Sequence, residues 1–413
     1  MRPLSLLVLA AVLVAGCGET DVDFDVDADV SAAATGLASS MVLDVEESVL
    51  AAAVDGSGSP VLVTSQMNSS GWPVLKRDGI TATAVELIGV SGVQSIWAMT
   101  VAPDDSVVMV ADAPYESEIV RVDPAGVVDR QVLQLQRAAD ANSYRARHPM
   151  RTYASFTADA TTAVVLTVPM QPLFPASDPS PESTGQVELH RVDTATGKVS
   201  AHSITQLPGP GPFVVLGVAV SPGGDLISVA VAHGPEGALT KSLAETNTLD
   251  AAVLRFDAAV QPIDQVHLTE QAGFAGGQPL AIDSSGTTYT VISRLDDDPE
   301  RHSGNVMLSI ARDSGRPEVV NDLEDVSEAM DLEVAPDGSF AYLPGWSTDH
   351  DLGVTVVDLA DGSITAQLDL CDGGVLTRAA LSPDASSLLV SGQCGSEEQA
   401  AAPAHRESVL VLR

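Results

Sequence analysis

The chain has little positive charge. Lysine occurs only at Lys76, Lys198 and Lys241, and 20 basic residues stand against 56 acidic ones, for a formal net charge of −36. A surface this acidic repels nucleic acid and anionic lipid headgroups. The composition therefore excludes general nucleic-acid binding and favours cationic partners, metal ions or a saline environment.

Aromatic residues and catalytic motifs are scarce as well. Aromatics make up 4% of the chain, whereas 45% is hydrophobic, which is ample for a core. The patterns G-x-S-x-G, H-E-x-x-H and C-x-x-C do not occur. The absence of a compact catalytic motif favours a binding role over an enzymatic one.

The first 16 residues read as a signal peptide. Arg2 precedes an apolar run over residues 4–14, which is too short to remain as a spanning helix. No later stretch is long and apolar enough to span a bilayer. Residues 13–17, Leu-Val-Ala-Gly-Cys, resemble the lipobox of bacterial lipoproteins, which implies cleavage before Cys17 and acylation of its sulfur. Gly18 then resembles the pattern of outer-membrane sorting, so we expect an anchored protein of the bacterial cell envelope.

Residues 17–39 read as an acidic tether. Five aspartates alternate with other residues between Asp21 and Asp29. An EF-hand loop beginning at Asp21 fails, because Val26 stands where glycine is needed and Ala32 where glutamate is needed. The alternative, an extended and self-repelling linker, fits the composition.

Residues 40–413 repeat one plan of four short strands. Around residues 331–370, apolar runs are separated by Pro336-Asp337-Gly338, by a polar loop and by Asp361-Gly362. Four strands joined by hairpins form one blade of a β-propeller. The tight turn between the first two strands of each blade, called the marker turn below, recurs seven times, beginning at Val54, Pro103, Ala158, Pro222, Ser284, Pro336 and Pro383. The sequence therefore predicts an all-β, seven-bladed propeller.

The connections between second and third strands vary in length. They are long at residues 169–186, 233–251, 294–305, 344–353 and 392–408, and short at 114–118. In a meander these connections share one end with the links between blades. We call this end the long-loop face and expect binding there.

The chain ends directly after the third strand of blade seven. Residues 40–46 form a spare strand before blade one. We expect this strand to complete blade seven and close the ring, which removes two open edges.

Two cysteines remain besides Cys17. Cys371 and Cys394 belong to the same end of the last blade, and the expected compartment is oxidising. A disulfide between them is predicted, with two free thiols as the alternative.

The long loops carry side chains that bind metals or transfer protons. The candidates are Asp296, Asp298, His302, Asp349, His350, Asp351 and His233. Histidines and carboxylates together could bind a divalent cation or serve as acid and base. The alternative is that these are solvated residues of an acidic chain.

A basic group also stands out. Its members are Arg145, Arg147, His148 and Arg151. These residues suit an anionic ligand or pairing with neighbouring acidic loops. Trp72, Trp97 and Trp346 suit carbohydrate stacking or packing within the fold.

Residues 334–370 resemble the YVTN-type β-propeller repeat. Ala335-Pro336-Asp337-Gly338, Ala341-Tyr342-Leu343 and residues 354–358, Val-Thr-Val-Val-Asp, carry the resemblance, and Ser382-Pro383-Asp384 repeats part of it. The resemblance implies the propeller fold. Such propellers include binding proteins, surface-layer proteins and lactonases. No set of lactonase catalytic residues matches.

Three functions follow as expectations, of which one, a subunit of an envelope assembly with no small ligand, is not separated by the sequence from the first of the other two. The first is a lipid-anchored, monomeric envelope propeller that holds a protein or glycan partner on its long-loop face. The second is a lactonase-like or metal-dependent hydrolase that uses the acidic and histidine residues of that face.

Overall fold

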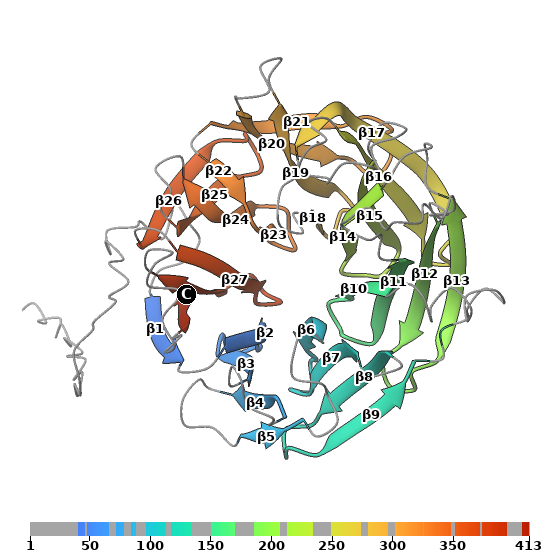
Figure 1. The fold of residues 1–413 in the computed structure, drawn as a ribbon, viewed down its shortest axis with the longest axis vertical. Helices are drawn as coiled ribbons and strands as arrows, with labels where there is room; N and C mark the ends of the chain where they lie inside the picture. The colour runs from blue at the N-terminus through green and yellow to red at the C-terminus, as the bar shows by residue number, and fades with distance from the viewer. Residues whose placement is uncertain are drawn as a thin grey trace, which may run out of the picture.

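The structure, a computed structural model, describes residues 40–412 except 46–47, 66–71, 78–83, 88–95, 113–116, 134, 136–149, 170–185, 207–212, 234–248, 274–279, 296–301, 325, 348–351, 372–373 and 395–406. All its regular elements are strands, arranged as seven blades in a ring (Figure 1). The prediction of an all-β, seven-bladed propeller is confirmed. None of the described residues belongs to a helix that could cross a membrane.

Blades 1 to 3 are separate four-stranded antiparallel sheets with the first strand nearest the axis. Their strands are β2 (Ser48–Val54), β3 (Pro60–Ser65), β4 (Val74–Arg77) and β5 (Val85–Glu86); β6 (Ile96–Val101), β7 (Val107–Asp112), β8 (Ser117–Val122) and β9 (Val128–Val132); and β10 (Met150–Phe156), β11 (Thr162–Pro169), β12 (Gln186–Asp193) and β13 (Val199–Gln206).

Blades 4 to 6 follow the same order, and the end of β17 also pairs with β19 of the next blade. Their strands are β14 (Phe213–Val220), β15 (Leu226–His233), β16 (Leu249–Asp257) and β17 (Pro262–Gly273); β18 (Leu280–Ile282), β19 (Thr288–Leu295), β20 (His302–Ile310) and β21 (Glu318–Leu323); and β22 (Val326–Ala329) with β23 (Glu333–Val334), β24 (Phe340–Ser347), β25 (Leu352–Asp358) and β26 (Ile364–Cys371).

Blade 7 joins the two ends of the chain. It contains β27 (Gly374–Leu381), β28 (Leu388–Cys394) and β29 (Glu407–Leu412), and β1 (Ser40–Val45) is its fourth strand. β1 pairs with β29 along its whole length, from Ser40 opposite Leu412 to Val45 opposite Glu407. The predicted closure of the ring is therefore confirmed, and Figure 1 shows the blue first strand beside the red last blade.

The marker turns share one hydrogen-bonding plan. In six blades an aspartate side chain in the turn accepts a nearby backbone N–H, as Asp104 does from Ser106 and Asp337 from Ser339, at 3.1 and 3.0 Å. In blade 4 the Ser221 hydroxyl takes this place and accepts from Asp225 and Leu226. Each turn also needs one residue with positive φ, a role that glycine fills most cheaply. This residue is Gly58, Asp105, Ala160, Gly224, Gly286, Gly338 and Ala385 in blades 1 to 7.

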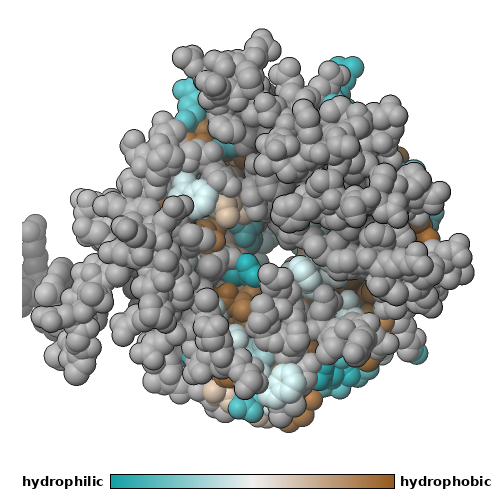
Figure 2. Space-filling model, viewed as in Figure 1, coloured by the Kyte–Doolittle hydropathy of each residue, from teal (hydrophilic) through white to brown (hydrophobic). Residues whose placement is uncertain are grey.

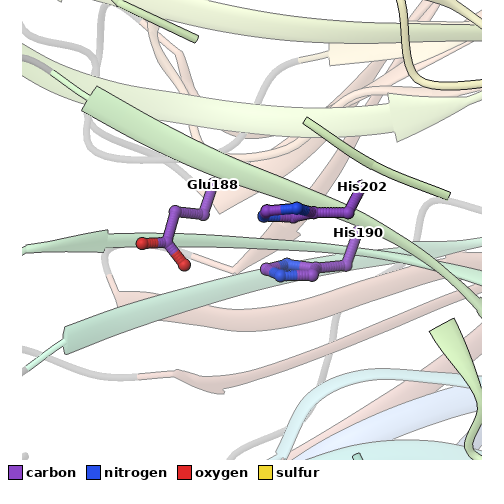
Figure 3. Close-up of side chains that lie close together, drawn as sticks. All are labelled: Glu188, His190 and His202. Atoms are coloured by element: carbon purple, nitrogen blue, oxygen red, sulfur yellow. The ribbon is translucent and has the colours of Figure 1, made fainter. Parts of the chain in front are cut away.

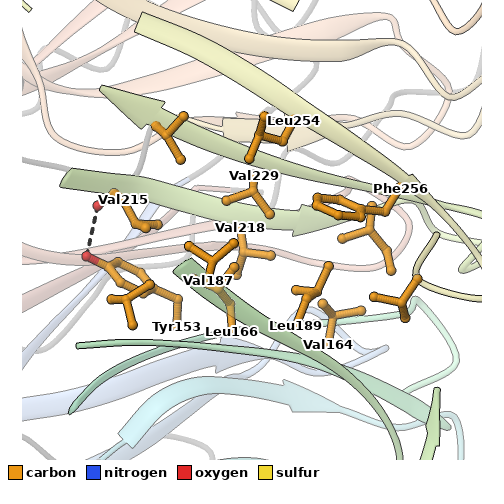
Figure 4. Close-up of a cluster of buried hydrophobic side chains, with 14 of the residues drawn as sticks. Tyr153, Val164, Leu166, Val187, Leu189, Val215, Val218, Val229, Leu254 and Phe256 are labelled. Atoms are coloured by element: carbon orange, nitrogen blue, oxygen red, sulfur yellow. Dashed lines mark hydrogen bonds between the residues drawn. The ribbon is translucent and has the colours of Figure 1, made fainter. Parts of the chain in front are cut away.

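Every seam between neighbouring blades holds its own apolar cluster. The seam between blades 3 and 4 joins Leu166 and Leu189 to Val229 and Phe256 (Figure 4). Tyr153 in this seam donates its hydroxyl to the carbonyl of Val215 at 2.8 Å, so blade 3 is also hydrogen-bonded to blade 4. Because strands bury both faces between blades, they read as nearly continuous runs of valine, alanine and leucine.

The strands extend further into some connections than the sequence suggested. β24 continues to Ser347 and β25 begins at Leu352, although residues 344–353 were expected to form a long loop. Pro344 lacks an N–H, but its carbonyl accepts from Met330 at 2.9 Å, so the sheet continues past it. Likewise β19 and β20 shorten the loop expected at 294–305 to residues 296–301.

Gly362 connects blades 5 and 6 through a close backbone approach. It has φ +74°, and a Cβ there would collide with the carbonyl oxygen of Val320 in β21. Asn321 of the same strand donates to the Gly362 carbonyl at 2.7 Å. We expect Gly362→Ala to lower the free energy of unfolding by about 2–4 kcal/mol, from the left-handed φ and the overpacking together.

The control for this substitution is Gly56→Ala. Gly56 has no atom within 4 Å of its built Cβ, and its φ is not positive. We expect it to change stability by less than about 0.5 kcal/mol. Chemical denaturation of both variants tests this pair, and equal losses would contradict the assigned contact.

Candidate functional site

The strand ends place the long connections on one face of the ring. Residues 170–185 lie between β11 and β12, residues 234–248 between β15 and β16, and residues 395–406 between β28 and β29. The marker turns, at the opposite ends of these strands, are short and internally hydrogen-bonded. The two faces therefore differ as predicted. In Figure 2 the centre of the ring opens as a hollow bordered by both hydrophilic and hydrophobic residues.

Most of the site residues predicted from sequence lie outside the described residues. These are Cys17, Asp296, Asp298, Asp349, His350, Asp351, Arg145, Arg147 and His148. The backbone places three others at strand ends on the long-loop face: His302 begins β20, His233 ends β15, and Arg151 lies near the start of β10. They belong to blades 5, 4 and 3, so their backbones are not in one blade.

Cys371 and Cys394 are placed by their backbones alone. Cys371 is the last residue of β26, and Cys394 ends β28 opposite Gly374 of β27. Cys371 therefore belongs to a strand of blade 6 and not to the link into blade 7, as the sequence had suggested. The disulfide stays a prediction.

The arginines that the structure does describe mostly hold blades together. Arg77, Arg191 and Arg255 each reach carbonyl oxygens of the next blade, for example Arg191 to Gly224 at 2.8 Å and to Ala258 at 2.9 Å. Arg191 and Arg255 stand two residues before the aspartate that closes a third strand. This Arg-x-Asp spacing was visible in the sequence but not recognised as an inter-blade contact.

The tryptophans do not form a common surface. Trp97 packs between blades 2 and 3, and Trp346 packs against the apolar cluster between blades 6 and 7. Trp72 is exposed. Packing is therefore the role of two of the three.

Two carboxylates lie at the inner edge of blade 6. Asp331 accepts the N–H of Leu332 at 2.9 Å, and Glu333 begins the inner strand β23. Burial raises the pKa of Asp331 to about 6, against the lowering effect of that hydrogen bond and of the Arg378 charge. Burial and the charge of Asp331 raise the pKa of Glu333 well above its ordinary value. Both carboxyl groups are therefore protonated more readily than ordinary ones.

The raised pKa of Asp331 predicts a pH dependence of stability. Between about pH 4 and pH 6 the folded protein binds more protons at Asp331 than the unfolded chain does. The contribution of Asp331 to the free energy of unfolding is therefore fully present below about pH 4, and it is lost as the pH rises through about 6. We expect Asp331→Asn to flatten the dependence of melting temperature on pH in this window, and an unchanged slope would contradict the assignment.

Sequence reasoning missed a compact cluster in blade 3. Glu188 and His190 alternate on β12, and His202 of β13 lies directly opposite His190. Their ligand atoms all lie within 4.8 Å of one another, and His190 is fully buried. The imidazole rings stack with centroids 4.5 Å apart and an interplanar angle of 24°. Figure 3 shows the Glu188 carboxylate beside the two stacked rings.

Only part of the signal for this cluster was present in the sequence. The strand period places Glu188 on the same face as His190. The hairpin closes with Val192 opposite Val199, and a register shift between Arg191 and Val192 brings His202 opposite His190. Two imidazoles and a carboxylate form a donor set for a divalent metal or a proton-transfer group.

No protein-family model and no curated protein matches the sequence. Several solved structures share the fold. An oligogalacturonate lyase in complex with manganese aligns over 95% of this chain and 97% of its own, with a TM-score of 0.54 and 14% identity. An oligogalacturonate lyase from Vibrio parahaemolyticus aligns over 90% of this chain and 90% of its own, with a TM-score of 0.51 and 12% identity. Kuenenia stuttgartiensis hydrazine synthase aligns over 83% of this chain and 92% of its own, with a TM-score of 0.52 and 13% identity.

These likenesses establish the architecture alone. The matched proteins carry names of different reactions, and one fold hosts many chemistries. The comparisons therefore support the architecture seen in the structure and leave the activity of this chain to be argued from its own residues.

Proposed function

We propose that this protein is a lipid-anchored binding or scaffold protein of the bacterial cell envelope. Its YVTN-like ring stands on a tether acylated at Cys17, and a monomer holds a protein or glycan partner on the long-loop face. The observation that carries this proposal is the contrast between the two faces. One face consists of short turns with internal hydrogen bonds, and the other receives the long connections, where repeat proteins place binding.

The marker-turn face supports the proposal by its construction. Arg77 and Arg191 bind carbonyl oxygens of the adjoining blades there, and turn aspartates bind their own backbones. Hydrogen-bonding groups used in this way are less available to a partner. The long-loop face, in contrast, tolerates connections of very different lengths, which is typical of a surface that varies with its ligand.

The experiment uses the full chain in its own envelope. Native electrophoresis of detergent extracts should show the chain in a larger complex or bound to glycan. Replacing residues 170–185 with a short Gly-Ser turn should abolish that species, whereas Asp105→Gly on the marker-turn face should not. Cys17→Ser should move the chain from the membrane fraction to the soluble fraction. Equal effects of the loop and turn variants, or a chain that always migrates alone, would contradict the proposal.

A second candidate is a metal-dependent enzyme, either a hydrolase or a lactonase-like protein. The observation that favours it is the Glu188, His190 and His202 cluster, whose donor set of two imidazoles and one carboxylate also occurs in catalytic zinc sites. This candidate requires a bound divalent cation.

A further inference from the structure

We propose that Glu188, His190 and His202 form a binding site for a first-row transition metal, best suited to Zn²⁺, in the seam between blades 2 and 3. This inference goes beyond the proposed partner binding, because a metal here requires no partner on the long-loop face. It also gives the second candidate function a specific site.

The strand period decides which seam contains the cluster. On β12, Val187 and Leu189 point into the seam between blades 3 and 4, where they join its apolar cluster. Glu188 and His190 alternate with them and so point the other way, toward blade 2. Val165, opposite His190 on β11, packs into the seam between blades 2 and 3 and confirms this direction.

The spacing of the three ligands is close to that of a metal site. Zn–N and Zn–O bonds of about 2.0–2.2 Å place the ligand atoms of a tetrahedral site roughly 3.4 Å apart. The observed atoms lie within 4.8 Å of one another, so side-chain movements on the order of 1 Å bring them together. Glu188 and His202 are only partly buried and can make these movements, whereas His190 is held in the core.

The stacked rings show which movement is needed. The lone pair that an imidazole nitrogen gives to a metal lies in the plane of the ring. Because the two rings are nearly parallel, their lone pairs point in parallel directions and do not converge on one point. Rotation of the His202 ring about its χ2 torsion turns its lone pair toward His190. In Figure 3 the Glu188 carboxylate lies on the same side of both rings, so one ion between them could reach all three side chains.

Other buried polar atoms in this seam also point to a ligand. Thr167 lies directly opposite Glu188 on β11 and is 2% exposed, and its hydroxyl has no hydrogen-bond partner among the described residues. The same holds for Nε2 of His202 and for Nε1 of Trp97, which packs in the same seam. An unsatisfied buried polar atom is unfavourable. A bound ion with its waters would engage Nε2 of His202 and give the Thr167 hydroxyl a partner.

The donor set selects the class of metal. Imidazole nitrogen suits zinc, copper, iron and nickel, whereas magnesium and calcium prefer oxygen ligands in larger number. Three protein ligands leave one position of a tetrahedral ion for water or substrate. The many aspartates elsewhere in the chain offer only oxygen ligands, so they do not share this preference for transition metals.

The test uses the purified full chain, obtained through a tag free of histidine. Isothermal titration with Zn²⁺ should give one strong site, with Mg²⁺ as the comparison ion, and Co²⁺ should give the visible absorption bands of a tetrahedral nitrogen–oxygen site. His202→Gln and Glu188→Gln keep polar side chains at partly buried positions. Each should weaken Zn²⁺ binding by more than the roughly 10–100-fold cost of losing an outer-shell hydrogen bond.

The matched control is His267→Gln. His267 of β17 is exposed, and its Nε2 lies 3.8 Å from the carboxylate of Asp250. It is therefore a histidine near a single carboxylate and outside the proposed metal site. It should leave Zn²⁺ affinity unchanged. Melting temperatures measured in chelator check that every variant is folded.

Three results would overturn the inference: no strong Zn²⁺ site in the wild type, equal loss in His267→Gln, or loss in His202→Gln with full affinity in Glu188→Gln. A chain that binds no Zn²⁺ but still enters the larger envelope complex would overturn this inference and leave the proposed function standing. A chain that binds Zn²⁺ at this site but always migrates alone would support this inference and contradict the proposed function.

Discussion

A chain that lacks residues 40–45 should lose several kilocalories per mole of stability and melt at a much lower temperature. These residues form β1, and all six pair with β29. At roughly 0.5–1.5 kcal/mol for each net hydrogen bond, the ladder contributes on the order of 5 kcal/mol. The deletion also leaves β29 as an open edge, and a long unpaired edge promotes aggregation.

The control for this deletion removes the same number of residues from the tether, 31–36. This variant should melt like the wild type, because β1 and its pairing are retained. Scanning calorimetry and light scattering measure the two effects, melting and aggregation. Equal melting temperatures for both deletions would show that β1 does not close the ring.

Arg255→Met should be among the most destabilising single substitutions in the ring. The Arg255 side chain is 2% exposed and donates from Nε to Asp264 at 2.7 Å. It also donates to the carbonyls of Ala311, Arg312 and Ser314 in blade 5, at 2.9, 3.0 and 2.7 Å. Removing the guanidinium leaves Asp264 without its cation and takes a donor from three carbonyls, of which Ala311 keeps the N–H of Ser314. The expected loss is about 3–5 kcal/mol.

Arg121→Met is the matched control. Arg121 occupies the equivalent place in blade 2, two residues before Asp123, and its bond to Asp104 is 2.6 Å long. Both side chains of this pair are substantially exposed, at 30% and 60%, so the expected loss is about 0–1 kcal/mol.

A double variant separates charge from packing at the buried pair. Asp264→Asn added to Arg255→Met removes the uncompensated carboxylate and should recover part of the lost stability. Urea denaturation measures all these variants. Equal losses for Arg255→Met and Arg121→Met would contradict the buried inter-blade role of Arg255.

Most of the fold could be predicted because local rules and tertiary structure agree in it. The Pro-Asp-Gly turn at Pro336 has a carboxylate that accepts a backbone N–H of its own turn and a glycine at positive φ. Turns in the other blades keep a residue at positive φ, although it is not always glycine. The spare strand at residues 40–45 was predictable by counting strands. Each of these features depends on neighbours in sequence or on a simple count.

Contacts between blades were harder to predict, because they depend on residues far apart in sequence. Arg255 donates hydrogen bonds to carbonyls of blade 5 that lie more than 50 positions later in the chain, and no local sequence pattern predicts these partners. Pro344 and Gly345 looked like loop residues, yet β24 continues through them because pairing with Val354 and Gly353 overrides their low strand propensity.

The sequence analysis did not single out the cluster of blade 3. Clusters such as Asp349-His350-Asp351 attracted attention because their members adjoin in sequence, and they lie outside the described residues. Glu188, His190 and His202 meet only through strand alternation and hairpin register. A search for ligand residues paired across predicted hairpins would have found them only if it allowed for the register shift between Arg191 and Val192.

The central claim is that one face of the ring holds the partner. The most direct measurement is photo-crosslinking in the envelope from the two ends of one strand. A photoreactive residue replaces either Gln186, where β12 leaves the long-loop face, or Thr196, in the turn at the opposite end. The account predicts a discrete crosslinked species from position 186 and none from position 196. The reverse pattern, or the same species from both positions, would contradict it.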